Sequence, residues 1–180
     1  KKHHPESKVL FGGLSASYFF GELMEYPEID FVLRGDSTEE PLRQLMDRLG
    51  DGGSLESVPN LVWRDASGEV RQNPLSHVPT DLGHVMRSHY TQTIRSVVRY
   101  RDLAGYTPFH GWQDYPISAV ITCRGCTHNC TMCGGSAFAF RESFGRPRPA
   151  FRSPEAVIND LRQISRFSRG PAFILGDLQQ

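Results

Sequence analysis

The sequence predicts an α/β fold in which strands and helices alternate in two separate parts of the chain. Near the start, the apolar runs 9–11 and 29–33 enclose the helix-compatible residues 16–24. Near the end, the β-rich runs 117–121 and 172–175 enclose a second helix. Alternation of this kind is typical of parallel sheets that are covered by helices.

Residues 1–50 are expected to supply only the later part of such a layer. A glycine turn, Gly12–Gly13, follows the first strand. After the second strand, Ser37 or Thr38 can cap a helix that Gly50 is expected to end. The apolar positions of this helix keep the i, i+3, i+4, i+7 spacing of a core-facing stripe. They are Leu42, Leu45, Met46 and Leu49.

Residues 51–115 are predicted to form a linker. The runs 60–64 and 69–72 flank an Asp-Ala-Ser-Gly turn, which indicates a β-hairpin. The rest of the linker has no sustained period apart from a short helix at 93–100.

Residues 116–180 are predicted to begin a second domain. Residues 138–152 are rich in Arg, Gly, Pro and Phe, and we expect them to form a loop. Ser153 then caps a helix with Pro154 at its first position. With the strands on either side, this helix makes the opening unit of a repeated βα barrel. Because the chain begins without Met and stops after a buried strand, we expect a fragment whose unpaired strand edges make it poorly stable alone.

Composition excludes several classes of function. Twenty acidic residues balance twenty basic ones, so no net charge favours nucleic acid or an anionic membrane surface. No apolar run approaches the roughly 20 residues that span a bilayer, and the start lacks a secretory signal. The expected location is therefore the cytoplasm.

All four cysteines fall within residues 123–133, which indicates a metal site, since a disulfide framework would spread them along the chain. Zinc knuckles separate their cysteine pairs by a dozen or more residues, whereas only three residues lie between the pairs here. The bacterial ferredoxin run has a different order of gaps. Thiolate sulfur suits an iron–sulfur cluster, and the spacing favours one over zinc.

Cys126, Cys130 and Cys133 have Cys-x3-Cys-x2-Cys spacing, and they follow a predicted strand and an Ile-Thr-Cys-Arg-Gly-Cys lead-in. This segment resembles the radical S-adenosylmethionine (SAM) superfamily. The resemblance implies that these three cysteines hold a [4Fe-4S] cluster whose fourth iron binds SAM. It also implies reductive cleavage of SAM to a 5′-deoxyadenosyl radical, with electrons from an external donor such as a flavodoxin or ferredoxin.

Further residues are assigned by the same resemblance. Met132 stands where relatives have an aromatic residue near the adenine, and Asp177 follows the second strand of the barrel, so both are candidates for binding SAM. The alternative for Asp177 is a buried carboxylate that caps the next loop. The Gly-Gly-Ser after Cys133 is not the family's Gly-Gly-Glu signature, which belongs to that second strand. Cys123 is interpreted as a small buried side chain, with a spare or exchangeable ligand as the alternative. Arg124, His128 and Asn129 are interpreted as solvated or shape-holding loop residues.

Gly12 and Gly13, with the strand and helix that follow, resemble the later half of a cobalamin-binding domain that precedes the radical domain in many relatives. The implied architecture is part of a flavodoxin-like (Rossmann-type) domain at 1–50, a linker with a β-hairpin at 51–115, and the start of a partial (β/α) TIM-type barrel at 116–180. Gly12 and Gly13 are candidates for approaching cobalamin. The alternative is the same fold without cobalamin. The Asp-x-His-x-x-Gly motif of some relatives does not occur in this chain.

The resulting hypothesis is a radical SAM enzyme, with cobalamin-associated methyl transfer as its reaction and rearrangement as the next candidate. The fragment alone is expected to be inactive. The alternative is a non-catalytic zinc or iron–sulfur module for structure or electron transfer. No residue is assigned a catalytic role, and the substrate is not readable from this sequence.

Overall fold

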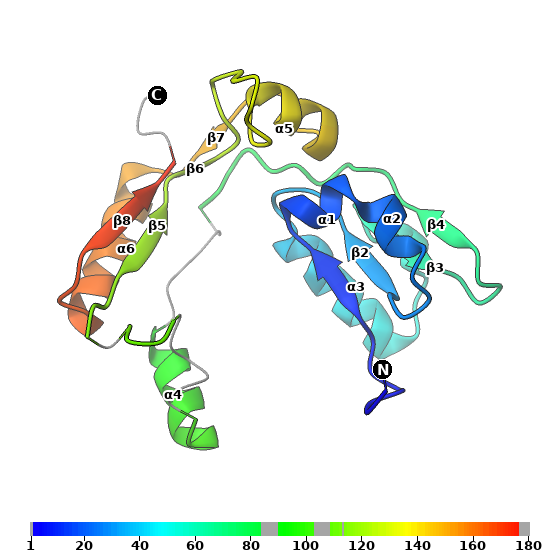
Figure 1. The fold of residues 1–180 in the computed structure, drawn as a ribbon, viewed down its shortest axis with the longest axis horizontal. Helices are drawn as coiled ribbons and strands as arrows, with labels where there is room; N and C mark the ends of the chain where they lie inside the picture. The colour runs from blue at the N-terminus through cyan, green and yellow to red at the C-terminus, as the bar shows by residue number, and fades with distance from the viewer. Residues whose placement is uncertain (1, 84–89, 103–108, 113, 177–180) are drawn as a thin grey trace. The chain divides into compact units, whose positions relative to one another are not determined.

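The computed structural model describes residues 2–83, 90–102, 109–112 and 114–176. It has a mixed α/β fold with two compact units (Figure 1). The first unit consists of Lys1–Thr80 together with Gly125–Pro149, and the second consists of Asp81–Arg124 together with Ala150–Gln180. The predicted α/β class is therefore confirmed.

The first unit is built on a four-stranded sheet with the order β1-β2-β3-β4. Strands β1 (Leu10–Gly12) and β2 (Phe31–Leu33) are parallel, as predicted. The predicted hairpin is present as β3 (Leu61–Arg64) and β4 (Val70–Gln72). Because β3 also pairs with β2 in antiparallel register, the hairpin extends the sheet that residues 1–50 begin.

Helices cover both faces of this sheet. Neighbouring residues of a strand point to opposite sides, so each face presents its own apolar side chains to a helix. Val32 and Val62 pack with apolar side chains near α1 (Leu14–Tyr18) and α2 (Phe20–Met24). Phe31, Leu33, Leu61 and Trp63 pack on the other face with Leu45 of α3 (Glu39–Asp51). The single helix predicted for residues 16–24 is in fact two short helices, because the backbone leaves the helical conformation at Phe19.

Two expectations for α3 are wrong. The helix continues through Gly50 and ends at Gly52, which takes the left-handed cap conformation with φ 71°. Glycine inside a helix costs only about 1 kcal/mol relative to alanine, so the helix tolerates Gly50. Of the four predicted core residues only Leu45 is buried, because a narrow stripe of α3 meets the sheet. The other three, Leu42, Met46 and Leu49, are exposed.

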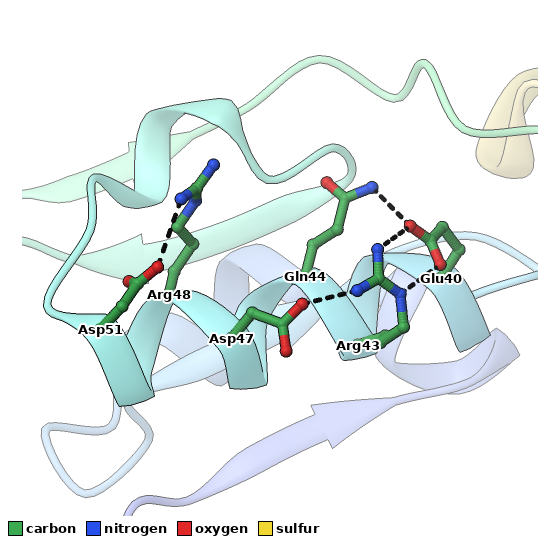
Figure 2. Close-up of polar contacts among 6 residues, drawn as sticks. All are labelled: Glu40, Arg43, Gln44, Asp47, Arg48 and Asp51. Carbon is green, nitrogen blue, oxygen red and sulfur yellow. Dashed lines mark hydrogen bonds and ion pairs between the residues drawn. The ribbon is translucent and has the colours of Figure 1, made fainter.

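The outer face of α3 carries a series of side-chain contacts one turn apart (Figure 2). The Arg43 guanidinium donates to the Glu40 carboxylate at 2.7 and 2.8 Å and to Asp47 at 2.6 Å. Gln44 also donates to Glu40, at 2.9 Å. Exposed pairs at i,i+3 and i,i+4 add little stability each, but they favour the helical conformation.

The second unit contains the strand, the helix and the second strand that were predicted for residues 116–180, whereas the cysteine loop between them belongs to the first unit. Strand β5 (Ser118–Ile121) is parallel to β8 (Ala172–Leu175), and α6 (Pro154–Phe167) connects them. Ser153 caps α6 as expected, because its Oγ accepts from the amide of Ala156 at 3.2 Å. The linker helix is also present, as α4 (Tyr90–Tyr100).

The stretch 138–152 is not entirely a loop, contrary to expectation. It contains most of α5 (Ala137–Phe144) and the short strand β7 (Ala150–Phe151), which pairs with β6 (Cys123–Arg124). Ser136 caps α5 through a hydrogen bond to the amide of Ala139, and Gly145 ends it in the left-handed conformation. The glycines and prolines that indicated a loop all follow Phe144.

Two remaining findings complete the fold. A short 3-10 helix, η1 (Leu55–Ser57), connects α3 to the hairpin. Within the part of the chain that the structure describes, no helix is long and apolar enough to cross a membrane.

We predict that Leu45→Ala destabilises the first unit by about 3 kcal/mol, because it leaves a cavity in the core beside Trp63. Chemical denaturation followed by Trp63 fluorescence in a Trp112→Phe background measures this. Met46→Ala is the matched control, since Met46 is 60% exposed and its loss is expected to cost less than about 0.5 kcal/mol. Equal losses for the two variants would contradict the packing described for α3.

We also predict that the Glu40 carboxyl titrates well below a normal glutamate. Hydrogen bonds from Arg43 and Gln44 lower the pKa of Glu40 from 4.5 to about 2. Its contribution to stability is complete above pH 4.5 and is lost as the pH falls from 4.5 towards 2. Carboxyl carbon NMR should show this midpoint, and Arg43→Gln should return the pKa of Glu40 towards 4.5. A normal midpoint in the unmodified chain would show that these contacts do not persist in solution.

Candidate functional site

The three cysteines of the predicted motif lie on one loop of the first unit, just before α5. Two tight turns shape this loop: the amide of Cys133 donates to the carbonyl of Cys130 at 3.2 Å, and the amide of Ser136 donates to the carbonyl of Cys133 at 3.2 Å. The amide of Ala137 also donates to the carbonyl of His128 at 2.8 Å, which joins the start of α5 to the middle of the loop. The loop therefore has a defined backbone.

Two of the cysteine sulfurs accept hydrogen bonds from backbone amides. The amide of His128 donates to Sγ of Cys126 at 3.3 Å, and the amide of Gly135 donates to Sγ of Cys133 at 3.4 Å. Hydrogen bonds to cluster sulfurs adjust the reduction potential of iron–sulfur centres. Cys130 and Cys133 are exposed and Cys126 is half-buried, so the thiols are accessible to an incoming metal.

The cysteine side chains are not gathered around a point. Within residues 2–83, 90–102, 109–112 and 114–176, no three His, Cys, Asp or Glu side chains lie close enough together to hold a metal ion. The donor set nevertheless suits a cluster, because three soft sulfur ligands stand on one short loop with amide donors beside two of them. The three-cysteine ligand set thus remains a prediction.

Cys123 differs from the other three cysteines in its surroundings. It is buried in the second unit, where β6 pairs with β7. A Cβ added to Gly176 would lie 2.8 Å from its Sγ and 2.7 Å from Oγ1 of Thr122. This close packing against the end of β8 agrees with the interpretation of Cys123 as a small core residue.

The residues assigned to SAM are less defined. Met132 lies between Cys130 and Cys133 and is 97% exposed, so it makes little contact with the described part of the chain. Asp177 lies outside the described residues. Asn129 supports the loop, as its Oδ1 accepts from the amide of Phe138 at 3.1 Å. This contact fits the shape-holding role predicted for it.

Gly12 and Gly13 lie where β1 ends and α1 begins. Gly13 has φ 88° and ψ −176°, a conformation that side chains with a Cβ rarely adopt. Apart from Gly13 and its two chain neighbours, no described residue has an atom within 4 Å of a Cβ built at Gly13, so the space beside this turn is open to a ligand. The turn conformation alone also accounts for a glycine here, and the cobalamin assignment is not decided by it.

Sequence reasoning missed three side chains that hold the loop in place. Arg146, which follows α5, is buried against Asp36, which follows β2. The hydroxyl of Tyr18, in α1, donates a hydrogen bond to the carbonyl of Gly134. The one signal in the sequence was that Asp36 follows a predicted strand; nothing near Arg146 indicated its partner 110 residues away.

Curated proteins similar to this chain are methyltransferases, and no family model matches the chain. The cytidylyl-2-hydroxyethylphosphonate methyltransferase of Streptomyces wedmorensis is 28% identical, over 74% of this chain and 28% of that protein. An uncharacterised methyltransferase of Pyrococcus horikoshii is 28% identical, over 77% of this chain and 26% of that protein. The chain thus spans just over a quarter of the length of these relatives.

Solved structures of radical SAM enzymes share the fold of this chain. TsrM from Kitasatospora setae, a radical SAM methyltransferase solved with tryptophan and a SAM analogue, matches 97% of this chain and 30% of its own, with a TM-score of 0.67 and 17% identity. OxsB, a cobalamin-dependent SAM radical enzyme solved with aqua-cobalamin and SAM, matches 93% of this chain and 20% of its own, with a TM-score of 0.60 and 18% identity. A second TsrM structure holds cobalamin and a [4Fe-4S] cluster.

The chain therefore has the fold of cobalamin-containing radical SAM enzymes across nearly its whole length. The resemblance that the cysteine spacing indicated is confirmed at this level. The curated similarity to methyltransferases agrees with it over about three quarters of the chain.

We predict that Cys126→Ser, Cys130→Ser and Cys133→Ser each remove most of the iron from the anaerobically reconstituted complete protein. Unmodified protein should hold about four iron atoms for this cluster type. Cys123→Ser is the matched control and should keep its iron, because Cys123 is buried against Gly176. Iron analysis together with the visible spectrum measures this. If Cys123→Ser lost iron as completely as Cys126→Ser, a four-cysteine site would be favoured instead.

Proposed function

We propose that this chain is part of a cobalamin-dependent radical SAM methyltransferase. The observation that carries this proposal is the loop of Cys126, Cys130 and Cys133, which occurs in a chain whose fold matches such enzymes over 97% of its residues. In this proposal the three thiolates hold a [4Fe-4S] cluster. When bound and reduced, such a cluster supplies the electron that cleaves SAM to methionine and a 5′-deoxyadenosyl radical.

In this proposal, several residues of the cysteine loop have assigned roles. The amides of His128 and Gly135 donate hydrogen bonds to Sγ of Cys126 and Sγ of Cys133, two of the proposed ligands. With three protein ligands, such a cluster would keep one iron available to SAM, and the candidates to contact SAM are Met132 within the loop and Asp177 after β8. The substrate contacts, and a flavodoxin or ferredoxin as electron donor, belong to the same proposal.

The domain assignment is also part of the proposal. Residues 1–50 represent the later half of a flavodoxin-like cobalamin-binding domain, in which the open space beside Gly13 admits the cofactor, and residues 51–115 represent the linker. The parallel β5–β8 pair with its crossover helix α6 represents the start of a partial TIM-type barrel. Two solved enzymes that share this fold were crystallised with cobalamin, which supports the assignment.

Methyl transfer is favoured over rearrangement by the curated similarities, since both relatives are methyltransferases. Methyl transfer from SAM leaves S-adenosylhomocysteine, whereas radical cleavage leaves 5′-deoxyadenosine. The two products therefore report on the two parts of the proposed reaction.

The complete protein, reconstituted anaerobically with iron, sulfide and hydroxocobalamin and then reduced in the presence of SAM, should release 5′-deoxyadenosine, S-adenosylhomocysteine or both. Chromatography with mass detection measures the products. Cys130→Ala should release neither, whereas Arg141→Gln, on the exposed face of α5, should behave as the unmodified protein. Absence of both products from a protein that holds its cluster would favour the non-catalytic module.

A further inference from the structure

Arg146 makes the most extensive buried polar contacts of the first unit. Its side chain is 1% exposed, and the guanidinium donates through both Nε and Nη2 to the two carboxylate oxygens of Asp36. Nη2 also contacts Oγ of Ser37 at 3.2 Å, and Nη1 donates to the carbonyl of Pro79 at 3.0 Å. Arg146 thus fixes the segment after α5 to the turn after β2 and to the connector that follows the hairpin.

Hydrogen bonds also connect the turn after β2 to the glycine turn after β1. The amide of Gly35, next to Asp36, donates to Oγ of Ser17 at 2.7 Å. The Ser17 hydroxyl donates to the carbonyl of Gly13 at 2.9 Å, and Ser17 is buried in α1. A continuous series of contacts therefore runs from Gly13 through Ser17 and Asp36 to Arg146.

The cysteine loop contacts the same elements at both of its ends. Before Cys126, Gly125 has φ 94°, and a Cβ placed on it would lie 2.9 Å from Cδ of Arg146 and 2.8 Å from Cα of Pro149. After Cys133, the carbonyl of Gly134 accepts the hydroxyl proton of Tyr18. The Tyr18 ring also meets Phe144 edge to face, with ring centres 5.1 Å apart. Arg146 supports one end of the loop and α1 supports the other.

We propose that Arg146 is a positioning residue that holds the cysteine loop against the turns after β1 and β2, and thereby couples a ligand at Gly12–Gly13 to a cluster on the loop. This inference rests on the proposed function for the identity of the two ligands. Coupling between sites is reciprocal, so a cluster should tighten cobalamin binding by the same factor by which cobalamin tightens the cluster. The contacts through Ser17, Asp36 and Arg146 supply a physical route for it.

The first test needs no cofactor. Hydrogen exchange of the metal-free complete protein should show the amides of Cys133, Ser136 and Ala137, all bonded within the loop, exchanging about tenfold faster in Arg146→Met. Because that variant leaves the Asp36 carboxylate buried, the double variant Asp36→Leu/Arg146→Met is tested alongside it. Buried ion pairs can often be replaced by apolar side chains without loss of folding. The double variant should therefore fold even if Arg146→Met does not.

Two controls separate positioning from general stability. Leu45→Ala weakens the core of the same unit away from the loop, and it should leave exchange of the loop amides within about twofold of the unmodified protein. Arg141→Met removes an exposed arginine from α5 and should change nothing. Loop amides that exchange equally in Arg146→Met, in the double variant and in the unmodified protein would overturn the proposal.

The second test measures the coupling. The dissociation constant of hydroxocobalamin is determined with and without the reconstituted cluster, and in the unmodified protein we expect the cluster to lower it about tenfold. In the Asp36→Leu/Arg146→Met variant this ratio should fall to about one, and in Leu45→Ala it should persist. A ratio retained in the double variant, or absent from an unmodified protein that binds both ligands, would overturn the coupling.

Failure of the proposed function can be distinguished from failure of the positioning role of Arg146. A complete protein that binds neither cluster nor hydroxocobalamin would remove the identity of the ligands and would overturn the coupling, while hydrogen exchange would still decide whether Arg146 positions the loop.

Discussion

The buried ion pair between Asp36 and Arg146 is the interaction on which the arrangement of the first unit depends. Removing two charges from water costs several kcal/mol per ion, and only good geometry with additional hydrogen bonds offsets this. The pair meets this requirement, because both carboxylate oxygens accept from the guanidinium and its remaining donors reach Ser37 and Pro79. Losing one partner would leave an uncompensated buried charge, at about 3–5 kcal/mol. The ion pair therefore holds the turn after β2 and the segment after α5 in a fixed position relative to each other.

This constraint explains why a compact unit is assembled from segments far apart in the chain. The sheet and its helices come from Lys1–Thr80, whereas the cysteine loop and α5 come from Gly125–Pro149. Gly125 can lie against the stem of Arg146 only because it has no side chain. Tyr18 then provides a second contact at Gly134 through α1. The cysteine loop thus takes its position from the end of the sheet where β1 and β2 terminate.

Short sequence patterns such as helix caps predicted much of the secondary structure, but they predicted few of the long-range contacts. Ser153 and Pro154 marked the start of α6 correctly, since a cap and a first-turn proline act within a few residues. Helix α5 was missed because a short helix with aromatic residues lies directly before a Gly-Arg-Pro stretch that is typical of a loop. The cysteine spacing predicted the family resemblance that the shared fold confirms, but the partner of Arg146 could not be predicted. Charged residues make up 22% of the chain, and no local rule selects one carboxylate among twenty acidic residues.

Two buried ion pairs among the described residues have different consequences. Arg152 and Asp160 form a second buried pair at 2.7 Å, which joins the start of α6 to its own second turn within the other unit. That pair spans eight residues, and it stabilises a local structure that the Ser153 cap already favours. The Asp36–Arg146 pair spans 110 residues and joins elements that no local signal brings together. In the proposed enzyme, radical chemistry and methyl transfer require two cofactors at a fixed separation, and a small misplacement of reacting groups lowers rates steeply. A long-range pair with a bidentate geometry is suited to fix that separation, whereas apolar packing, which has no direction, would tolerate sliding of the loop.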